Sequence, residues 1–184
     1  MKRKIAILRG INVGGKRKIL MADLKDLCET LGLEDVRSYI QSGNLIFTSD
    51  KINSELEENL EKAIADKFGF DVPVIVRSAE ELQNSIDKNP FFDEDTDIDR
   101  LHLTFLKEKP TKENLETTLT YNYEPDKFKI DGKDVFIFCT GKYHQSKLTN
   151  DFFEKKLKKR ATTRNWKTVL KLYEFVSFPF SGPV

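Results

Sequence analysis

The sequence predicts an α+β fold made of two similar units, and three observations lead to this prediction. Short apolar runs typical of strands alternate with longer stretches in which apolar residues recur every three or four positions, as in helices. Their order in residues 1–77 is strand, helix, strand, strand, helix, strand. A similar order begins again at residue 100. With 184 residues, of which 39% are hydrophobic, the chain is large enough to bury a core.

The first unit, residues 1–77, opens with a strand and a helix. Residues 4–11 begin with a continuous apolar run typical of a central strand. Residues 21–31 follow, with apolar residues at helical spacing from Leu20 onward, and Gly32 is placed to end that helix. This part of the chain therefore predicts a strand, a basic glycine-containing connection and an amphipathic helix.

A hairpin, a second helix and a last strand complete the first unit. Strands are predicted at 36–40 and 45–48, joined by the tight turn Gln41-Ser42-Gly43-Asn44. A charged amphipathic helix is expected at 54–68 and a β-branched strand at 72–76. The complete order matches the split β-α-β, or ferredoxin-like, pattern.

Residues 78–99 are predicted to be a helical and acidic linker. Ser78-Ala79-Glu80-Glu81 is a capping box that opens a short helix, and Asn89-Pro90 ends it. The acidic run 93–99 follows. These features are typical of a connection between two units.

The second unit is predicted at 100–176, with 177–184 as a loose tail. Its expected elements are, in chain order, a strand at 101–105, a helix at 111–119, strands at 128–130 and 135–138, a helix capped by Asn150, and a helix at 163–176. The last helix carries an apolar stripe that begins at Trp166. We therefore expect a second β-α-β-β-α unit, in tandem with the first, that lacks or alters its last strand.

Composition and charge exclude several classes of protein. No apolar run approaches the roughly 20 residues of a membrane-spanning helix, so no membrane partner is expected. Cys28 and Cys139 lie far apart without metal-binding spacing, which predicts reduced thiols in a cytoplasmic protein. The net charge of +1 hides two basic segments, because residues 1–18 carry seven Lys and Arg and residues 142–171 carry ten. If these segments lie together, they form a cationic face.

The predicted topology places the connection after the first strand beside the first hairpin turn. In a split β-α-β unit both lie at the same end of the sheet, about 10 Å apart at ~4.8 Å per strand. The connection offers glycines for an anion-binding concavity and leads to a helix N-terminus. We expect its candidate ligands at Arg9, Asn12, Gly14, Gly15 and Lys16, together with Gln41, Ser42 and Asn44.

Other interpretations of this connection remain open. The glycine spacing fits neither the P-loop nor the dinucleotide-binding pattern, and glycine-rich connections after strands are common. Gly43-Asn44 is also explained by turn chemistry alone. The connection can therefore be a flexible loop with a solvated edge.

A second group of candidate ligands lies in the basic C-terminal part. Tyr143, His144, Ser146 and Lys147 stand in a polar segment after Gly141. Further along, Thr162 or Thr163 is a natural N-cap for the last helix, which places Arg164 and Asn165 in its first turn as ligands for an anion. The alternative is that Thr163 only caps the helix while Arg164 and Asn165 are solvated. No cluster has metal-ligand spacing, and the sequence identifies no cofactor.

Four motifs together resemble a known family. The segments RGINVGGKRKILMADL, YIQSGNLIF, KYHQSKLTNDFFEKKL and ATTRNWKTVLKL resemble the bacterial domain-of-unknown-function family 1697 from Arg9 to about Leu172. The resemblance implies a cytosolic α+β protein of two ferredoxin-like parts. It implies no reaction, cofactor or catalytic residue.

Three functions compete. The leading hypothesis is a binding protein for a phosphate-bearing ligand, either a nucleotide or RNA, that uses residues 9–18 and the basic C-terminal motifs. The alternative is a small enzyme acting on a phosphorylated metabolite, in which Arg9, Lys16 and Arg164 hold the anion and His144 or Tyr143 moves a proton. A third possibility is a partner-binding protein that uses the acidic run. The sequence leaves the oligomeric state open.

Overall fold

The computed structural model describes residues 1–178, and these residues fold as α+β with two four-stranded antiparallel sheets. The chain divides into two compact units. Of the described residues, the first unit comprises 1–83 and 171–178, and the second comprises 84–170. Residues 171–178 thus belong with the first unit, whereas the sequence placed the whole of 100–176 in the second. Of the predicted tail, 179–184 lies outside the described residues.

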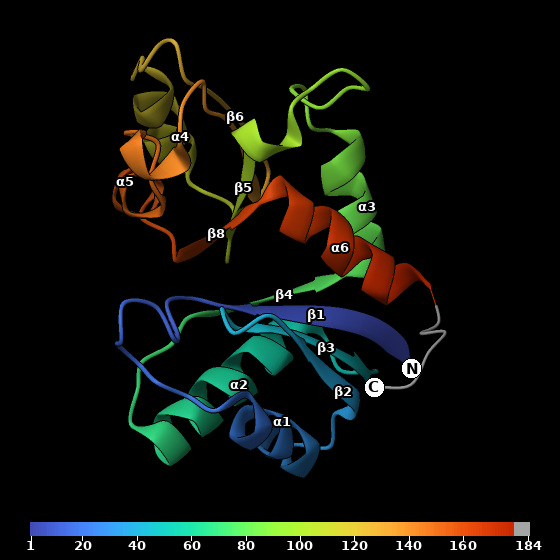
Figure 1. Ribbon diagram of the computed structural model, residues 1–184. Coiled ribbons are helices and arrows are strands. Elements are labelled where there is room, and N and C mark those ends of the chain that lie inside the picture. The colour runs from blue at the N-terminus through green and yellow to red at the C-terminus, as the bar shows by residue number, and fades with distance from the viewer. Residues whose placement is uncertain (179–184) are drawn as a thin grey trace. The chain divides into compact units, whose positions relative to one another are not determined.

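The first unit contains every element expected from the sequence, with ends shifted by a few residues. The elements are β1 (Lys2–Leu8), α1 (Met21–Thr30), β2 (Glu34–Tyr39), β3 (Asn44–Ser49), α2 (Asn53–Phe68) and β4 (Val74–Ser78). The strand order is β2-β3-β1-β4, so β2 and β4 form the edges. Both α1 and α2 cover the same face of this sheet (Figure 1).

The core of the first unit lies between the sheet and these two helices. Alternate residues of the strands point toward the helices, and the apolar stripe of each helix meets them. The fully buried residues of this core include Ala6, Leu8, Phe47, Leu24 and Ile64. Leu20 was expected on the same stripe, but it is 71% exposed because it lies before the first turn of α1.

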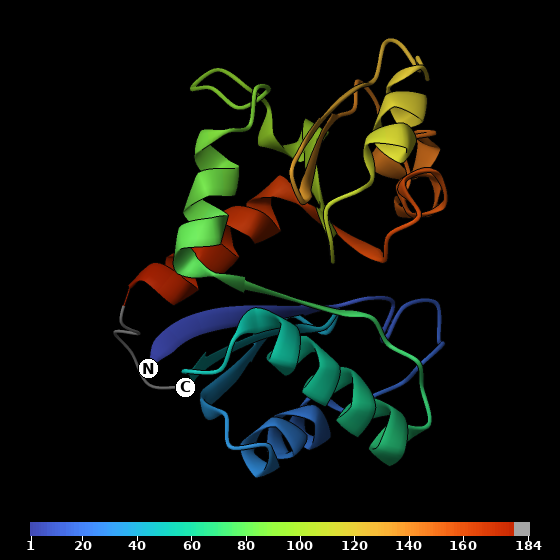
Figure 2. The same ribbon diagram turned by 180° about the vertical axis from the view of Figure 1, so that it is seen from behind.

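The second unit repeats the same strand order. Two helices, α3 (Ala79–Asp87) and α6 (Trp166–Ser177), each span the boundary of the units. Between them the elements of the second unit are the 3₁₀ turn η1 (Ile98–Arg100), β5 (Leu101–Leu106), α4 (Lys112–Leu119), β6 (Lys127–Asp131), β7 (Asp134–Phe138), the 3₁₀ turn η2 (Tyr143–Gln145), α5 (Asn150–Leu157) and β8 (Ala161–Asn165). The strand order is β6-β7-β5-β8. Both α4 and α5 lie on one face of this sheet (Figure 2).

The expectation that the second unit lacks or alters its last strand is wrong. Residues 161–165 form β8, which pairs with β5 so that Leu103 lies opposite Arg164. The predicted helix 163–176 begins only at Trp166. β8 is short and largely polar, so its sequence lacks the apolar run of a central strand, and its residues directly precede the apolar stripe of α6 without a break.

Helix caps confirm one sequence prediction and correct two others. The Ser78 hydroxyl accepts from the Glu81 N–H at 3.1 Å, and the Glu81 carboxylate accepts from the Ser78 N–H at 2.8 Å, so the capping box of α3 is present. Thr149, not Asn150, caps α5 by accepting from the N–H of Phe152. Asn165, not Thr162 or Thr163, caps α6 by accepting from the Thr168 N–H at 2.8 Å.

The two units also repeat individual backbone hydrogen bonds. The Leu8 N–H donates to the Gly43 carbonyl at 2.8 Å, and in the second unit Leu106 N–H donates to the Lys133 carbonyl at 2.8 Å. Likewise, the Arg9 N–H donates to Pro73 and the Lys107 N–H to Arg160, both at 2.9 Å. Because these bonds match, corresponding connections in the two units can be compared directly in length. Within residues 1–178, no helix is long and apolar enough to cross a membrane.

Candidate functional site

The connection from β1 to α1 is a small hairpin with a glycine tip. Lys16 N–H donates to the Val13 carbonyl at 3.1 Å, and Asn12 N–H donates to the Arg17 carbonyl at 3.2 Å. The two tip residues, Gly14 and Gly15, have φ of +59° and +75°. Positive φ at both central residues is typical of a type I′ turn, which strongly favours glycine. The glycines therefore form a defined turn, not an irregular loop.

The side chain of Asn12 ties this connection to the first hairpin turn. Its Nδ2 donates to the carbonyls of Ile19 at 2.9 Å and Gln41 at 3.0 Å, and its Oδ1 accepts from the Ile19 N–H at 2.9 Å. The predicted convergence of residues 9–18 with the turn 41–44 is therefore present. Asn12 holds the site together and is itself largely committed to backbone groups.

Two other predicted ligands, Ser42 and Asn44, form hydrogen bonds within the first hairpin turn. Asn44 is fully buried, and its Nδ2 donates to the Tyr39 carbonyl at 3.0 Å and to the Ser42 hydroxyl at 3.2 Å. These bonds close the β2–β3 hairpin. Asn44 is thus positioned to shape the site, whereas Gln41 is exposed and lines its wall.

A pocket of about 400 Å³ opens beside the glycine turn. It is lined by Asn12, Gly15, Lys18, Ile19, Leu20, Met21 and Gln41. One wall is apolar, because Leu20 is 71% exposed and Met21 is half-buried. The other wall is polar and carries the Lys18 side chain. The N-terminus of α1 begins here, and Leu20 at its N-cap has no side chain that can cap it.

Three of the positive charges near this pocket have no acidic partner in the part of the chain that the structure describes. Within the described residues, Lys16, Arg17 and Lys18 form no ion pair, and the first acidic residue along the chain is Asp23. Lys16 and Lys18 are exposed, while the Arg17 guanidinium donates to the Arg9 carbonyl at 3.4 Å. The connection therefore presents cationic groups to solvent.

The second unit shows that this connection is longer than the fold requires. Its corresponding connection, between β5 and α4, has five residues, 107–111, whereas the first unit uses twelve, 9–20. The flanking hydrogen bonds of Leu8 and Arg9 have direct counterparts at Leu106 and Lys107. The additional residues, which include the glycine turn, are thus not needed to pass from strand to helix.

The C-terminal candidates Tyr143, His144, Ser146 and Lys147 lie in the connection between β7 and α5. The Tyr143 ring stacks on His102 with centroids 4.3 Å apart, and burial raises the pKa of its hydroxyl. The Ser146 hydroxyl donates to Asp126 at 2.6 Å. His144 is exposed, and the Lys147 ammonium lies 5.7 Å from the centroid of Tyr123.

Thr163, Arg164 and Asn165 are not arranged as expected. They lie on β8, where successive side chains point to opposite faces, so they do not converge on one helix N-terminus. The Thr163 hydroxyl lies 2.7 Å from that of Thr104 and donates to Asn150 at 3.0 Å. Arg164 donates to the Thr162 hydroxyl at 2.9 Å, and burial lowers its pKa to about 10.

The predicted ligands thus form two groups, one in each unit. Sequence reasoning missed Leu20 and Met21, which form the apolar wall, because it assigned them to the helix and its stripe. A leucine immediately before a helix start, after three cationic residues, was the available signal. Among residues 1–178, no three His, Cys, Asp or Glu side chains gather as a metal site would require.

His102 gives the protein a predicted pH dependence. Burial lowers the pKa of His102 below its usual 6.5, against opposing effects of the Arg100 carbonyl and the Asp99 charge. Because the unfolded chain binds the proton more readily, the stabilising contribution is complete above pH 6.5 and is lost as the pH falls through the lower folded pKa. Urea unfolding between pH 7 and 5 should show this loss in the parent protein and in His144→Gln. His102→Gln should reduce it, and an unchanged pH slope in that variant would contradict the assignment.

The chain is similar to one family of proteins and to solved structures. The model of a family described as a protein of unknown function, DUF1697, matches residues 1–136. A solved structure of a conserved bacterial protein from Streptococcus pneumoniae is similar, with 28% sequence identity and a TM-score of 0.78. The similarity covers 95% of this chain and 98% of that one. No curated protein matches the chain.

Proposed function

The chain belongs to the DUF1697 family of proteins of unknown function, and we propose that it is a binding protein for a phosphate-bearing ligand. The pocket beside the glycine turn is its site. The single observation that carries the proposal is the excess length of residues 9–20 over their counterpart in the second unit. The fold does not need this excess, and it places cations and glycines at a pocket.

Phosphate is the chemical group that this pocket suits. Lys18 lines it directly, and Lys16 stands next to Gly15 at the turn. At Gly15 a side chain is absent, so a phosphate can approach the backbone closely. The start of α1 adds main-chain N–H groups and a positive dipole end.

The apolar wall favours a nucleotide over inorganic phosphate. A pocket of about 400 Å³ falls in the size range of small-molecule sites. The exposed Leu20 and the half-buried Met21 offer a surface on which a base can pack, in the same pocket as the Lys18 side chain. A base and its phosphates would then use both walls at once.

Together with this function we propose a fold type for the two units and a cellular location. We propose that both units are ferredoxin-like, because each has the order β-α-β-β-α-β and the same strand order. We also propose a cytoplasmic location, because Cys28 and Cys139 are free thiols. Burial raises the pKa of Cys28 to about 12, which keeps this thiol protonated and unreactive.

A thermal-shift and calorimetric titration tests the proposed function. Nucleoside triphosphates, nucleoside monophosphates and pyrophosphate should be added to the purified protein. A ligand at 100 times its Kd stabilises the folded state by about 2.7 kcal/mol, which raises the melting temperature by several degrees. Lys18→Ala and Lys16→Ala should each weaken binding about tenfold, because a hydrogen bond to a charged group contributes about 1.5 kcal/mol or more.

Lys109→Ala is the matched control, because Lys109 stands in the five-residue connection of the second unit. It should bind like the parent protein. The proposal is wrong if no phosphate compound stabilises the protein, or if Lys16→Ala and Lys18→Ala both keep the parent affinity. A nucleoside that binds as tightly as its nucleotide would reject phosphate recognition in particular.

A further inference from the structure

The connection between β7 and α5 is the second place where the two units differ in length. The first unit passes from β3 to α2 in three residues, 50–52, whereas the second uses eleven, 139–149, between β7 and α5. The start of α5 is therefore farther along the chain from the end of β7 than the start of α2 is from the end of β3. As in the first unit, the additional residues exceed what the fold requires, but they lie at the other end of the sheet.

Hydrogen bonds to Asp126 and a buried leucine hold this long connection in place. Both carboxylate oxygens of Asp126 are engaged: Oδ1 accepts from the N–H and hydroxyl of Thr140 at 2.9 and 3.0 Å, and Oδ2 accepts from Ser146 at 2.6 Å. Burial acts to raise the pKa of Asp126, but these hydrogen bonds lower it overall, so the carboxylate stays ionised. Leu148 is fully buried at the end of the connection.

A pocket of about 390 Å³ lies between this connection and residues 122–126. Four charged residues line it, the cations Lys142 and Lys147 and the acids Glu124 and Asp126. Within the described residues neither lysine forms an ion pair, and hydrogen bonds from Thr140 and Ser146 engage both Asp126 oxygens. The amides of the pocket are Asn122 and Gln145. Asn122 accepts from the Glu124 N–H through Oδ1, which leaves its amide N–H groups available to a ligand.

Aromatic rings continue from one wall of the pocket. Tyr123 lines it, and its ring stacks with that of Tyr121 at 6.1 Å between centroids with an angle of 20° between the planes. Both rings are half-buried, and lysines lie over them: Lys147 is 5.7 Å from the centroid of Tyr123, and Lys156 is 4.3 Å from that of Tyr121. Phe152 supports both rings from the side.

These groups match the parts of a nucleic-acid single strand. Lysines neutralise phosphates, tyrosine faces stack with bases, and primary amides read base edges. One residue, Asn122, separates the two tyrosines, and their rings stack on one another, so Tyr121 extends the aromatic surface from Tyr123 beyond the pocket. An isolated phosphate would use the lysines alone and leave the rings and amides without a role.

We propose that this pocket and the adjoining tyrosines bind single-stranded RNA. The site lies wholly in the second unit and goes beyond the nucleotide site proposed for the first. One base stacks at Tyr123 with its edge toward Asn122 and Gln145, and the flanking phosphates contact Lys142 and Lys147. The strand continues over Tyr121 toward Lys156.

Fluorescence anisotropy with a labelled ten-nucleotide RNA of mixed sequence tests this proposal at several salt concentrations. Lys142→Ala and Lys147→Ala should each weaken binding about five- to tenfold. Each should also reduce the slope of log K against log salt by about 0.7, the value for one phosphate contact to a single strand. Tyr123→Leu should weaken binding about tenfold and leave the salt slope unchanged, because stacking releases no counterion.

Two controls separate this site from others. Lys109 lies at the opposite end of the second sheet, and Lys18 lies in the first unit, so Lys109→Ala and Lys18→Ala should bind RNA like the parent protein. Failure of nucleotide binding at Lys18 would therefore leave this proposal intact. The proposal is overturned if Lys142→Ala and Lys147→Ala, both exposed and expected to fold, keep the parent affinity and slope. It is equally overturned if a duplex of the same length binds as tightly as the single strand.

Discussion

Replacing Gly43 with alanine should lower the free energy of unfolding by about 2–5 kcal/mol. Gly43 has φ of +83°, a backbone conformation that costs an alanine about 1–2 kcal/mol. A Cβ at this position would also stand 2.8 Å from the Leu8 Cβ and 2.9 Å from Ile11 side-chain atoms. Both neighbours are fully buried and cannot move aside, so overpacking adds about 1–3 kcal/mol.

Gly69→Ala is the matched control for this prediction. Gly69 has a similar φ of +73°, but no atom lies within 4 Å of a Cβ built there. It should lose only the backbone cost of about 1–2 kcal/mol. Urea unfolding of both variants measures the difference. Equal losses would show that the close approach of Gly43 to Leu8 and Ile11 contributes nothing.

The same variant connects stability with the candidate site. The Gly43 carbonyl accepts from the Leu8 N–H at the end of β1, where the connection 9–20 begins. A displacement of this turn would also move Gln41, whose carbonyl holds Asn12. Gly43→Ala should therefore weaken nucleotide binding even under conditions in which the protein remains folded, whereas Gly69→Ala should not.

Much of the fold could be predicted because its signals are local. The period of apolar residues predicted β1, α1, β3 and α2, and the capping box at Ser78 was correct in both of its hydrogen bonds. The topological rule then predicted that residues 9–18 lie beside the turn 41–44, and the Asn12 hydrogen bonds confirm this. These inferences need only neighbours in sequence or a general rule of chain topology.

The errors have a common physical cause, which is that the deciding partner is distant in sequence. β8 is polar at Thr162, Thr163 and Arg164, and only its pairing with β5 makes it a strand. Asn12 resembled a ligand because an amide is suited to binding, but backbone groups seven and 29 residues away already occupy its side chain. The apolar wall at Leu20 was missed because the helical spacing of apolar residues extends one residue before the start of α1 at Met21.

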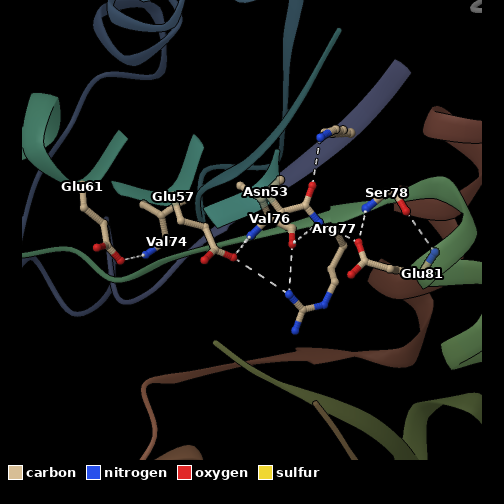
Figure 3. A network of polar contacts seen from close by, with 9 residues as sticks. Asn53, Glu57, Glu61, Val74, Val76, Arg77, Ser78 and Glu81 are labelled. Carbon is tan, nitrogen blue, oxygen red and sulfur yellow. Dashed lines mark hydrogen bonds and ion pairs between the residues drawn. The ribbon is translucent and has the colours of Figure 1, made fainter. Parts of the chain in front are cut away.

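In both units, glutamates of a helix accept hydrogen bonds from N–H groups of an edge strand, a pattern that only the three-dimensional structure shows. The N–H groups of Val74 and Val76 point away from the sheet, and each donates to a glutamate of α2: Val74 to Glu61 at 2.9 Å and Val76 to Glu57 at 2.8 Å (Figure 3). In the second unit, the Ala161 N–H of β8 donates to Glu154 of α5 at 3.1 Å. Helix carboxylates thus satisfy edge groups that would otherwise pair with another strand.

Replacing Glu57 with leucine should lower the free energy of unfolding by about 3–5 kcal/mol. Glu57 is only 5% exposed, and its carboxylate also lies 4.0 Å from the guanidinium of the buried Arg77. Leucine removes both the acceptor of the Val76 N–H and the charge that faces Arg77. Breaking a buried pair from one side is costly because the remaining charge is still desolvated.

Two further variants determine whether the charge pair causes this loss. Glu61→Leu removes an equivalent acceptor one helical turn away, from a half-buried position, and should cost only about 1 kcal/mol in urea unfolding. The double variant Glu57→Leu with Arg77→Met replaces the pair with apolar side chains, which is often nearly neutral, so it should recover most of the stability lost in Glu57→Leu. If the double variant is instead less stable than Glu57→Leu, Arg77 stabilises the unit through contacts other than Glu57. In that case, the cost of Glu57→Leu arises at the edge strand, from the Val76 N–H.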